Sequence, residues 1–320
     1  MFIRHTPSIY EGKFNLYLSM NHTIEVVITL PLETYLLGVV PYEMGNDSPL
    51  ESLKAQAVAA RSEATMALIS KLYSGPHHDL TSDVECQVFS GNLKRTFLTD
   101  RAVRETKSLI LAEDRRPINA YYASNCGGHS EVIQNVWPER PNPESYNLAA
   151  TDNKKRNSVE LEEEHSVRKW IMSQPQVYCN PYLGIDLPPW SQKNFRWKKI
   201  MDVKNISKMI AGEDDWGNLL DIKVIERGLS GRIIKAQFIF ENERLEIEGE
   251  LAIRQLWKPA LRSSCFFVEK DADNFILHGA GWGHGVGMCQ SGAVAQAKNG
   301  KEFISMLKHY YRKAELLKLY

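Results

Sequence analysis

Residues 37–64, "LGVVPYEMGNDSPLESLKAQAVAARSEA", decide how the first part of the chain folds. An apolar run ends in a single acidic residue, Glu43, and a segment with helical periodicity follows it. That segment carries a cation, Arg61, among its apolar positions. A lone carboxylate followed at once by a cationic helix is the feature around which we expect a functional site.

The cationic helix has a clear start signal. Ser48 is of the residue type preferred at an N-cap, Pro49 suits the first helical position, and Glu51 stands where a capping box needs an acid. We therefore predict a helix from Ser48 to about Tyr73. A short helix starting at Pro31 is expected before it, in "PLETYLLGVV".

Lys54 lies seven residues before Arg61, so both side chains share one side of the predicted helix. That side is the apolar stripe, which is formed by Leu50, Leu53, Ala57, Ala64 and Leu68. Two interpretations stay open. Either the stems are buried at the edge of the stripe while the charged ends reach water, or both cations turn into a cleft.

Glu43 also has two interpretations. Backbone N–H groups or the helix dipole could satisfy it. Alternatively it is a general acid, because apolar neighbours such as Val39 and Met44 would raise its pKa, and a carboxyl with a pKa of about 6 to 7 can donate a proton at neutral pH. Arg61 beside it would stabilise the anion, so we expect Arg61 to bind substrate or organise the ground state rather than pair tightly with Glu43.

The rest of the chain predicts an α+β fold with antiparallel strands. Strands are expected at 84–89, in a hairpin at 108–123, at 219–256, and in two runs within 12–30 that meet at Asn21-His22. One helix is expected from about 291, carrying "FISMLKHYY". We expect two lobes that form a cleft: a catalytic core of residues 1–136 and 261–320, and a second lobe of residues 137–260 inserted between them.

The glycine-rich segment "HGAGWGHGVGMCQSGA", residues 278–293, matches neither the dinucleotide-binding nor the P-loop spacing. Alternating glycines permit positive φ and a close approach of the backbone to a ligand. Trp282 could stack on a sugar ring, and His284 and Gln290 could supply polar edges. The alternative is a tightly packed turn in which His284 bonds to the backbone.

Composition narrows the function classes. Lys plus Arg and Asp plus Glu both number 39, and this neutrality argues against a protein that binds duplex nucleic acid. No apolar run approaches the roughly 18 residues of a membrane-spanning helix, and the first 20 residues have no signal-peptide core, so we expect a protein that stays inside or a mature form. The five cysteines are widely spaced without a CxxC pair, unlike a disulfide framework or a zinc finger.

Four segments resemble the stage II sporulation protein D (SpoIID) family of peptidoglycan lytic transglycosylases and related amidase enhancers. They are "LPLETYLLGVVPYEM…LESLKAQAVAARSEA", "DVECQVFSG", "INAYYASNCGGHSE" and "GAGWGHGVGMCQSGAVAQAKNGKEFISMLKHYY". The similar regions span residues 29–131 and 261–317, whereas residues 137–260 match only loosely.

The resemblance implies a role for particular residues. Glu43 occupies the position of the proposed catalytic acid, and Lys54 and Arg61 match cations that matter for activity. The other matching segments imply that substrate-binding residues line the same cleft; these are Gln87, Trp282, His284 and Gln290.

Some family members bind zinc through a histidine and two cysteines near the matching "CQVF" position. Cys86 corresponds to the last of these cysteines, but "HHDLTSDVE" before it contains no second cysteine. We therefore predict no metal. The alternative is a site in which Cys86 and Cys126 meet His78 or His129 in space.

These observations predict an enzyme of the bacterial cell envelope. A lytic transglycosylase needs one carboxylate, whereas hydrolytic glycosidases commonly need two. Glu43 would protonate the oxygen between N-acetylmuramic acid (MurNAc) and N-acetylglucosamine (GlcNAc), then accept the proton of the muramic 6-hydroxyl and leave a 1,6-anhydro end. The expected partners are glycan strands, including strands without peptide stems, and a cell-wall amidase. The alternative is a non-catalytic wall-binding enhancer of that amidase.

Overall fold

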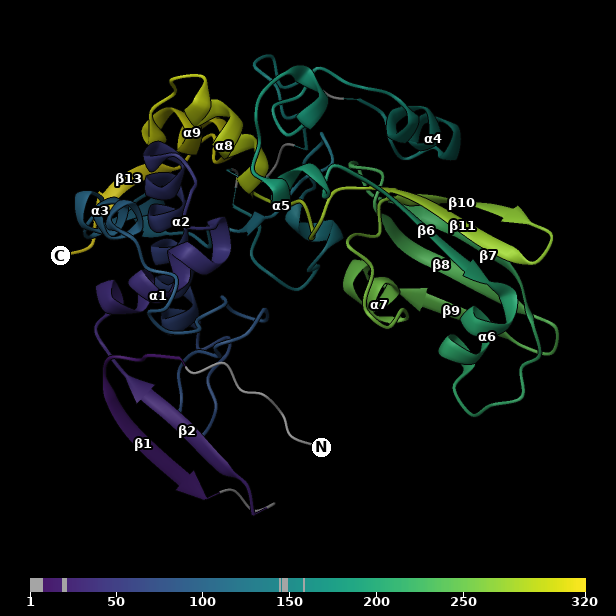
Figure 1. Cartoon of the computed structure of the whole chain (residues 1–320), viewed down its shortest axis with the longest axis horizontal. Helices are drawn as coiled ribbons and strands as arrows, with labels where there is room; N and C mark the ends of the chain where they lie inside the picture. Colours follow the sequence, from purple (N-terminus) through teal and green to yellow (C-terminus); the bar gives the residue numbers. More distant parts are fainter. Residues whose placement is uncertain (1–7, 19–21, 144, 146–148, 158) are drawn as a thin grey trace. The chain divides into compact units, whose positions relative to one another are not determined.

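The computed structural model describes residues 8–18, 22–143, 145, 149–157 and 159–320 (Figure 1). The chain forms two compact units. Unit 1 comprises residues 1–121, 297–309 and 313–320, and unit 2 comprises residues 122–296 and 310–312. Residues 122–136 and 261–296 therefore pack within unit 2, whereas we expected them in the core with residues 1–121.

Unit 1 is built around three helices: α1 (Leu32–Met44), α2 (Leu50–Ser70) and α3 (Phe97–Glu105) (Figure 1). Almost every residue of α2 from Ser52 to Thr65 is buried, whichever side of the helix it occupies. Its many alanines let neighbouring elements approach closely. The predicted amphipathic stripe is thus wrong: α2 is a central helix, and Leu68 near its end is 41% exposed.

The start of α2 differs in detail from the prediction. Pro49 takes the cap position and no side chain caps the helix. The Ser48 hydroxyl instead donates to the carbonyl of Met44 at 2.6 Å, because α1 continues through Pro41 as far as Met44. The capping-box prediction is therefore wrong, and Glu43 lies in the last turn of a helix that is longer than expected.

The strands of unit 1 confirm two of the predicted hairpins. β1 (Lys13–Leu18) pairs with β2 (Ile24–Thr29) in antiparallel register; the predicted junction residue Asn21 lies outside the described residues. β3 (Leu109–Glu113) pairs with both β4 (Arg116–Pro117) and β13 (Glu315–Lys318). The strand predicted at residues 84–89 is absent, since those described residues form turns and irregular backbone.

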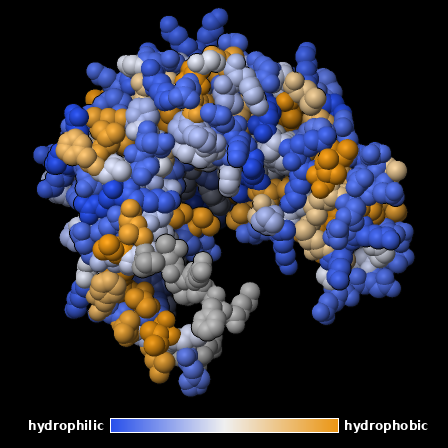
Figure 2. All heavy atoms as spheres, viewed as in Figure 1, coloured by the Kyte–Doolittle hydropathy of each residue, from blue (hydrophilic) through white to orange (hydrophobic). Residues whose placement is uncertain are grey.

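The β1–β2 hairpin exposes an apolar face. Hydrophobic side chains gather over the hairpin in Figure 2, and the register places Leu16 opposite Val26 and Leu18 opposite Ile24. These side chains are 56–74% exposed. Residues opposite one another in an antiparallel pair share a face of the sheet, so this face is continuous.

Unit 2 contains two three-stranded antiparallel sheets, which confirm the α+β class. One has the order β10 (Phe266–Asp271), β11 (Asn274–Ala280), β6 (Arg196–Asp202). The other has the order β7 (Leu219–Arg227), β8 (Ile233–Phe240), β9 (Arg244–Glu248). The strands predicted within 219–256 are confirmed as far as Glu248, whereas residues 250–255 form a helix. Phe238, Trp257 and Phe275 belong to one buried core between these elements.

Short elements complete the fold. Unit 2 carries the helices α4 (Glu164–Met172), α5 (Pro189–Gln192), α6 (Val203–Ala211) and α7 (Glu250–Gln255). It also contains 3-10 turns at Ile133–Asn135 and Pro181–Leu183, and a parallel pair of β5 (Tyr122–Ala123) with β12 (Met288–Cys289). The predicted C-terminal helix is two helices, α8 (Gln290–Lys298) and α9 (Phe303–Tyr310), because Gly300 adopts a positive φ between them. Of the described helices, none combines the length and the hydropathy needed to cross a bilayer.

Candidate functional site

Glu43 is held by the segment that follows Cys86. Its carboxylate accepts the backbone N–H of Val88 at 2.9 Å. The side chain is partly exposed, and it lies in the last turn of α1. A hydrogen bond from a fixed amide sets the orientation of the carboxylate without removing it from solvent.

The segment that holds Glu43 is anchored to α2 by Gln87. This side chain is 1% exposed, and its Nε2 donates to the carbonyl of Ala60 at 3.2 Å and approaches the Tyr35 hydroxyl at 3.5 Å. Gln87 therefore positions the loop from inside the protein, which differs from the predicted contact with substrate.

Three carboxylates act on the thiol of Cys86. Burial raises the pKa of this thiol to about 12, and the negative charges of Glu63, Asp83 and Glu43 act in the same direction. The thiol is therefore protonated at neutral pH. Glu63, a buried residue of α2, therefore acts on the same thiol as Glu43.

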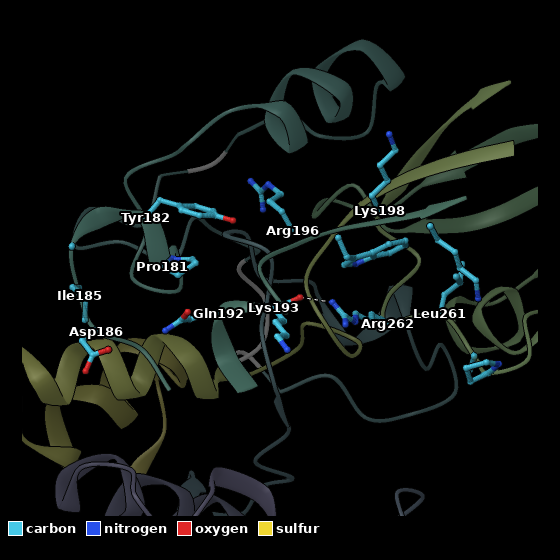
Figure 3. Close-up of a pocket in the computed structure, with 15 residues that line it drawn as sticks. Pro181, Tyr182, Ile185, Asp186, Gln192, Lys193, Arg196, Lys198, Leu261 and Arg262 are labelled. Atoms are coloured by element: carbon cyan, nitrogen blue, oxygen red, sulfur yellow. Dashed lines mark hydrogen bonds between the residues drawn. The ribbon is translucent and has the colours of Figure 1, made fainter. Parts of the chain in front are cut away.

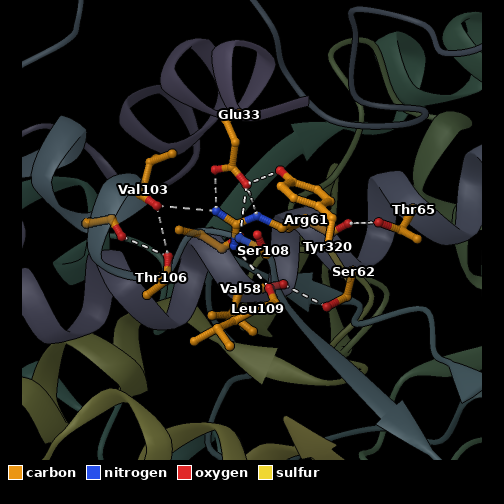
Figure 4. A network of polar contacts seen from close by, with 12 residues as sticks. Glu33, Val58, Arg61, Ser62, Thr65, Val103, Thr106, Ser108, Leu109 and Tyr320 are labelled. Atoms are coloured by element: carbon orange, nitrogen blue, oxygen red, sulfur yellow. Dashed lines mark hydrogen bonds and ion pairs between the residues drawn. The ribbon is translucent and has the colours of Figure 1, made fainter. Parts of the chain in front are cut away.

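Arg61 belongs to a different network (Figure 4). Its side chain has no exposed surface, and its Nε and Nη2 donate to the two carboxylate oxygens of Glu33 at 2.9 and 2.8 Å. Nη1 donates to the carbonyl of Leu109 at 3.0 Å, and the Tyr320 hydroxyl and the Ser108 N–H donate to Glu33. Arg61 thus pairs tightly with Glu33 and not with Glu43. Burial among these partners suits a residue that positions α2, and a contact of Arg61 with substrate stays a prediction.

Lys54 is also engaged by acids of unit 1. Its ammonium lies 2.7 Å from both Glu51 and Glu105, and 13% of its side chain is exposed. It joins α2 to α3 through these ion pairs. A contact of Lys54 with substrate stays a prediction.

The two cations and the Glu43 neighbourhood lie on opposite sides of α2. At about 100° per residue, Glu63 projects about 180° from Lys54 and about 160° from Arg61. Gln56 lies seven residues before Glu63 and is fully buried on the same side. Sequence reasoning missed this second polar pair, although its spacing in the helix equals that of Lys54 and Arg61.

A cavity of 670 Å³ adjoins this part of unit 1. It lies between β2 and residues 77–83, and Tyr35 and Phe89 contribute to its wall. Because Tyr35 also contacts Gln87, the cavity is continuous with the side chains that hold the Glu43 loop.

Unit 2 contains the glycine-rich segment. Gly281, Gly283, Gly285 and Gly287 all adopt positive φ, between 74° and 98°, as their alternation predicts. The crowding that requires them is internal. A Cβ on Gly281 would lie 2.8 Å from the carbonyl oxygen of Asn125, and one on Gly285 would lie 2.5 Å from the Arg232 guanidinium. The close approach is therefore to the protein itself.

The three predicted binding residues of this segment differ in exposure. The Trp282 side chain is 44% exposed, with the Arg262 guanidinium 5.3 Å from its ring centre. His284 accepts the N–H of Val286 through Nδ1 at 3.0 Å, and burial lowers its pKa to about 3, so the imidazole is neutral. Gln290 is 3% exposed. His284 thus serves the packed turn, while Trp282 alone of the three offers a broad face to solvent.

Unit 2 also contains a cavity, of 930 Å³, which lies near Arg262 (Figure 3). Its wall is rich in cations and includes an exposed aromatic ring; it contains Tyr182, Lys193, Lys198, Lys199 and Arg262. Asp186 is the acidic residue among those that line it. Such a wall suits a ligand that carries carboxylates and sugar or other ring faces.

The histidines nearest Cys86 in the sequence have other partners in this structure. His78 Nδ1 lies 2.7 Å from Glu25, and the His77 ring stacks on Tyr17 at 3.9 Å. Within the described ranges, no group of three or more candidate ligands includes Cys86. His129 Nδ1 bonds to the carbonyl of Ser130 at 2.9 Å.

Comparison with known proteins agrees with the sequence motifs. Residues 20–112 match the family model "SpoIID: Stage II sporulation protein", and residues 131–287 match a domain of unknown function, DUF8618. An uncharacterized protein of Brachyspira hyodysenteriae is 28% identical over 94% of this chain and 71% of its own length. Stage II sporulation protein D of Bacillus amyloliquefaciens is 26% identical over 97% of this chain and 80% of its own length.

A third relative is named as an amidase enhancer and not as a sporulation protein. The amidase enhancer of Bacillus subtilis is 27% identical over 86% of this chain, which corresponds to 39% of the enhancer. The family predicted from the motifs is confirmed: this chain contains a SpoIID domain in residues 20–112 and is similar to stage II sporulation protein D over most of its length.

Proposed function

We propose that this chain cleaves peptidoglycan glycan strands as a lytic transglycosylase, with Glu43 as general acid and base. The observation that carries the proposal is the placement of Glu43. Its carboxylate is partly exposed and fixed by the Val88 N–H at 2.9 Å, within the part of the chain that matches the SpoIID model.

The proposed reaction moves one proton through Glu43. The carboxylic acid protonates the glycosidic oxygen as the bond from muramic C1 breaks and the GlcNAc chain leaves. The carboxylate then accepts the proton of the muramic 6-hydroxyl, whose oxygen bonds to C1 and closes the 1,6-anhydro ring. A second protein carboxylate is not needed as nucleophile, because the substrate supplies the attacking oxygen.

The other predicted site residues fall into two groups, those that are buried and those that are exposed. Arg61 and Gln87, which are buried and bonded within unit 1, would keep α1, α2 and the Glu43 loop in place. In unit 2, the exposed ring of Trp282 could stack on a sugar. The lysine-rich cavity beside Tyr182 would attract the lactyl carboxylates of strands that have lost their peptides.

Product analysis tests the proposal. Purified glycan strands, with and without peptide stems, are digested by the wild-type chain and by Glu43→Gln, and the products are analysed by mass spectrometry. We expect 1,6-anhydro ends from the wild type, and a rate for Glu43→Gln that is lower by about 10²–10⁴-fold. A matched control, Glu85→Gln, changes an exposed acid of the same loop and should keep full activity.

Two results would overturn this assignment. Turnover by Glu43→Gln at the wild-type rate would remove Glu43 from the chemistry. Reducing ends in place of anhydro ends would indicate hydrolysis, for which Glu63 would be the natural second carboxylate.

A non-catalytic function is the alternative, and the similarity to the amidase enhancer favours it. In that case the chain binds the wall and stimulates an amidase without cutting glycan. The same digests distinguish the two functions. An enhancer would yield no glycan products itself, and Glu43→Gln would stimulate a cell-wall amidase as well as the wild type does.

A further inference from the structure

Three cysteines and an aspartate from distant parts of the sequence meet inside unit 2. One ligand atom from each of Cys126, Asp152, Cys179 and Cys289 lies within 4.8 Å of all the others, and all four residues are buried. Two of the cysteines are 163 residues apart in the chain. The catalytic proposal above uses none of the four.

The spacing of the sulfurs is that of metal ligands. The Sγ atoms of Cys126 and Cys179 are 3.6 Å apart. A disulfide would need about 2.05 Å. In a tetrahedral zinc site with Zn–S bonds of about 2.3 Å, two sulfurs lie about 3.8 Å apart. The observed distance is close to this value without any movement of the backbone.

The surroundings orient the four side chains. The backbone N–H groups of Cys126 and Gly292 donate to the Cys289 sulfur at 3.3 and 3.4 Å. The Tyr310 hydroxyl donates to Oδ1 of Asp152 at 3.0 Å. Hydrogen bonds of this kind fix the orientation of ligands around protein metal ions.

Gly292 leaves the space that the aspartate needs. A Cβ at this position would lie 2.3 Å from Oδ2 of Asp152 and 2.3 Å from the Tyr310 hydroxyl. The partly buried guanidinium of Arg156 interacts electrostatically with Asp152 and Cys126. It would offset part of the negative charge that three thiolates and a carboxylate bring.

We propose that Cys126, Asp152, Cys179 and Cys289 form a structural zinc site. The three thiols would release their protons to solvent as Zn²⁺ binds. Four protein ligands would fill the tetrahedron, as in structural rather than catalytic zinc sites. The metal would tie the loop at Cys126 to the end of the glycine-rich segment, and it is separate from the zinc position implied for Cys86.

The wild-type chain provides the first test. The full chain is purified under reducing conditions without chelator, and its zinc content is measured by mass spectrometry of the metal. We expect one zinc ion per chain. Chelation should lower the thermal unfolding temperature and added Zn²⁺ should restore it, because a metal that binds only the folded state stabilises that state. Cobalt in place of zinc should produce thiolate-to-cobalt charge-transfer absorption.

Variants then locate the ion. Cys289→Ser should lose zinc. Cys265→Ser, which changes another buried cysteine of unit 2, and Cys86→Ser should both keep it. Because Cys289→Ser could fail to fold, Asp152→Asn serves as a nearly isosteric second variant, and its zinc affinity should fall by at least about tenfold.

Three outcomes would overturn the proposal. The reduced wild type could contain no metal and gain no stability from Zn²⁺. Peptide mapping could find a Cys126–Cys179 disulfide in the purified chain. Zinc could also be retained in Cys289→Ser but lost in Cys86→Ser, which would place the ion in unit 1.

Discussion

Two charged residues, Arg61 in α2 and Glu43 in α1, lie toward different sides of α2 and under opposite conditions. On one side, Arg61 is fully buried and its guanidinium is bonded to Glu33 and to main-chain carbonyls. On the other, α2 holds the segment that orients Glu43, which keeps part of its side chain in solvent. Both residues stood out in the sequence as charges among apolar neighbours. The structure shows that this signal has two causes.

Arg61 and Glu43 differ in the groups that surround their charges. A buried charge is tolerated when opposite charge and hydrogen bonds surround it, and Arg61 has both. A charge that acts on a substrate must be within reach of that substrate. Exposure therefore separates Glu43, a candidate for chemistry, from Arg61, which stabilises the fold that presents it.

The largest effect on stability should come from breaking the pair of Arg61 with Glu33. Arg61→Met would remove the guanidinium from Glu33 and from the carbonyls around it. Because Glu33 is 21% exposed and still accepts from Tyr320 and Ser108, we expect the free energy of unfolding to fall by about 3 kcal/mol, the low end for a broken buried pair. Urea unfolding measures this change. Glu43→Gln is the control from the other side of α2. It should cost no more than about 1 kcal/mol, because the amide oxygen can still accept the Val88 N–H. Near-wild-type stability of Arg61→Met would contradict the comparison.

A smaller effect should appear as a dependence on pH. Burial raises the pKa of Glu33, but the hydrogen bonds from Arg61 and Tyr320 outweigh it and hold the pKa below 4.5. A carboxyl with a lowered pKa in the folded state stabilises the protein above its unfolded pKa, and this contribution is lost as the pH falls through the folded value.

Glu33→Gln tests this dependence. The variant should be less stable than the wild type at pH 7, and the difference should shrink as the pH falls below the ordinary carboxyl pKa of 4.5. Urea unfolding across the acid range measures the difference. A gap that stays constant with pH would show that Glu33 is not ionised in its pair with Arg61.

The smallest effect concerns the thiol near Glu43. The charge of Glu63 helps to raise the pKa of Cys86, so Glu63→Gln should lower that pKa and speed alkylation of the thiol several-fold at fixed pH. Cys86 can be followed selectively, because the other four cysteines are buried. Glu51→Gln, on the Lys54 side of the same helix, should leave the rate unchanged. Equal alkylation rates in the wild type, Glu63→Gln and Glu51→Gln would show that the charge of Glu63 does not act on the Cys86 thiol.

The sequence by itself determined the local elements and the family. The two hairpins, the helix that carries Lys54 and Arg61, and the positive φ of alternating glycines follow from short-range patterns of residue size and polarity. The motifs around Glu43 identified the SpoIID domain. Such features depend on neighbours within a few residues, so periodicity and turn chemistry reveal them.

Only the tertiary structure decided the partners. Arg61 pairs with Glu33, 28 residues away, and Ser48 caps a carbonyl of α1 in place of its own helix. Cys126 meets a cysteine 163 residues later. No local pattern records these distances, because hydrogen bonds and ligand geometry depend on where distant segments pack. For the same reason the sequence showed charged residues in and beside α2, but it did not show which are buried. Only the tertiary structure distinguished Arg61, which is buried and holds the fold, from Glu43, which reaches solvent.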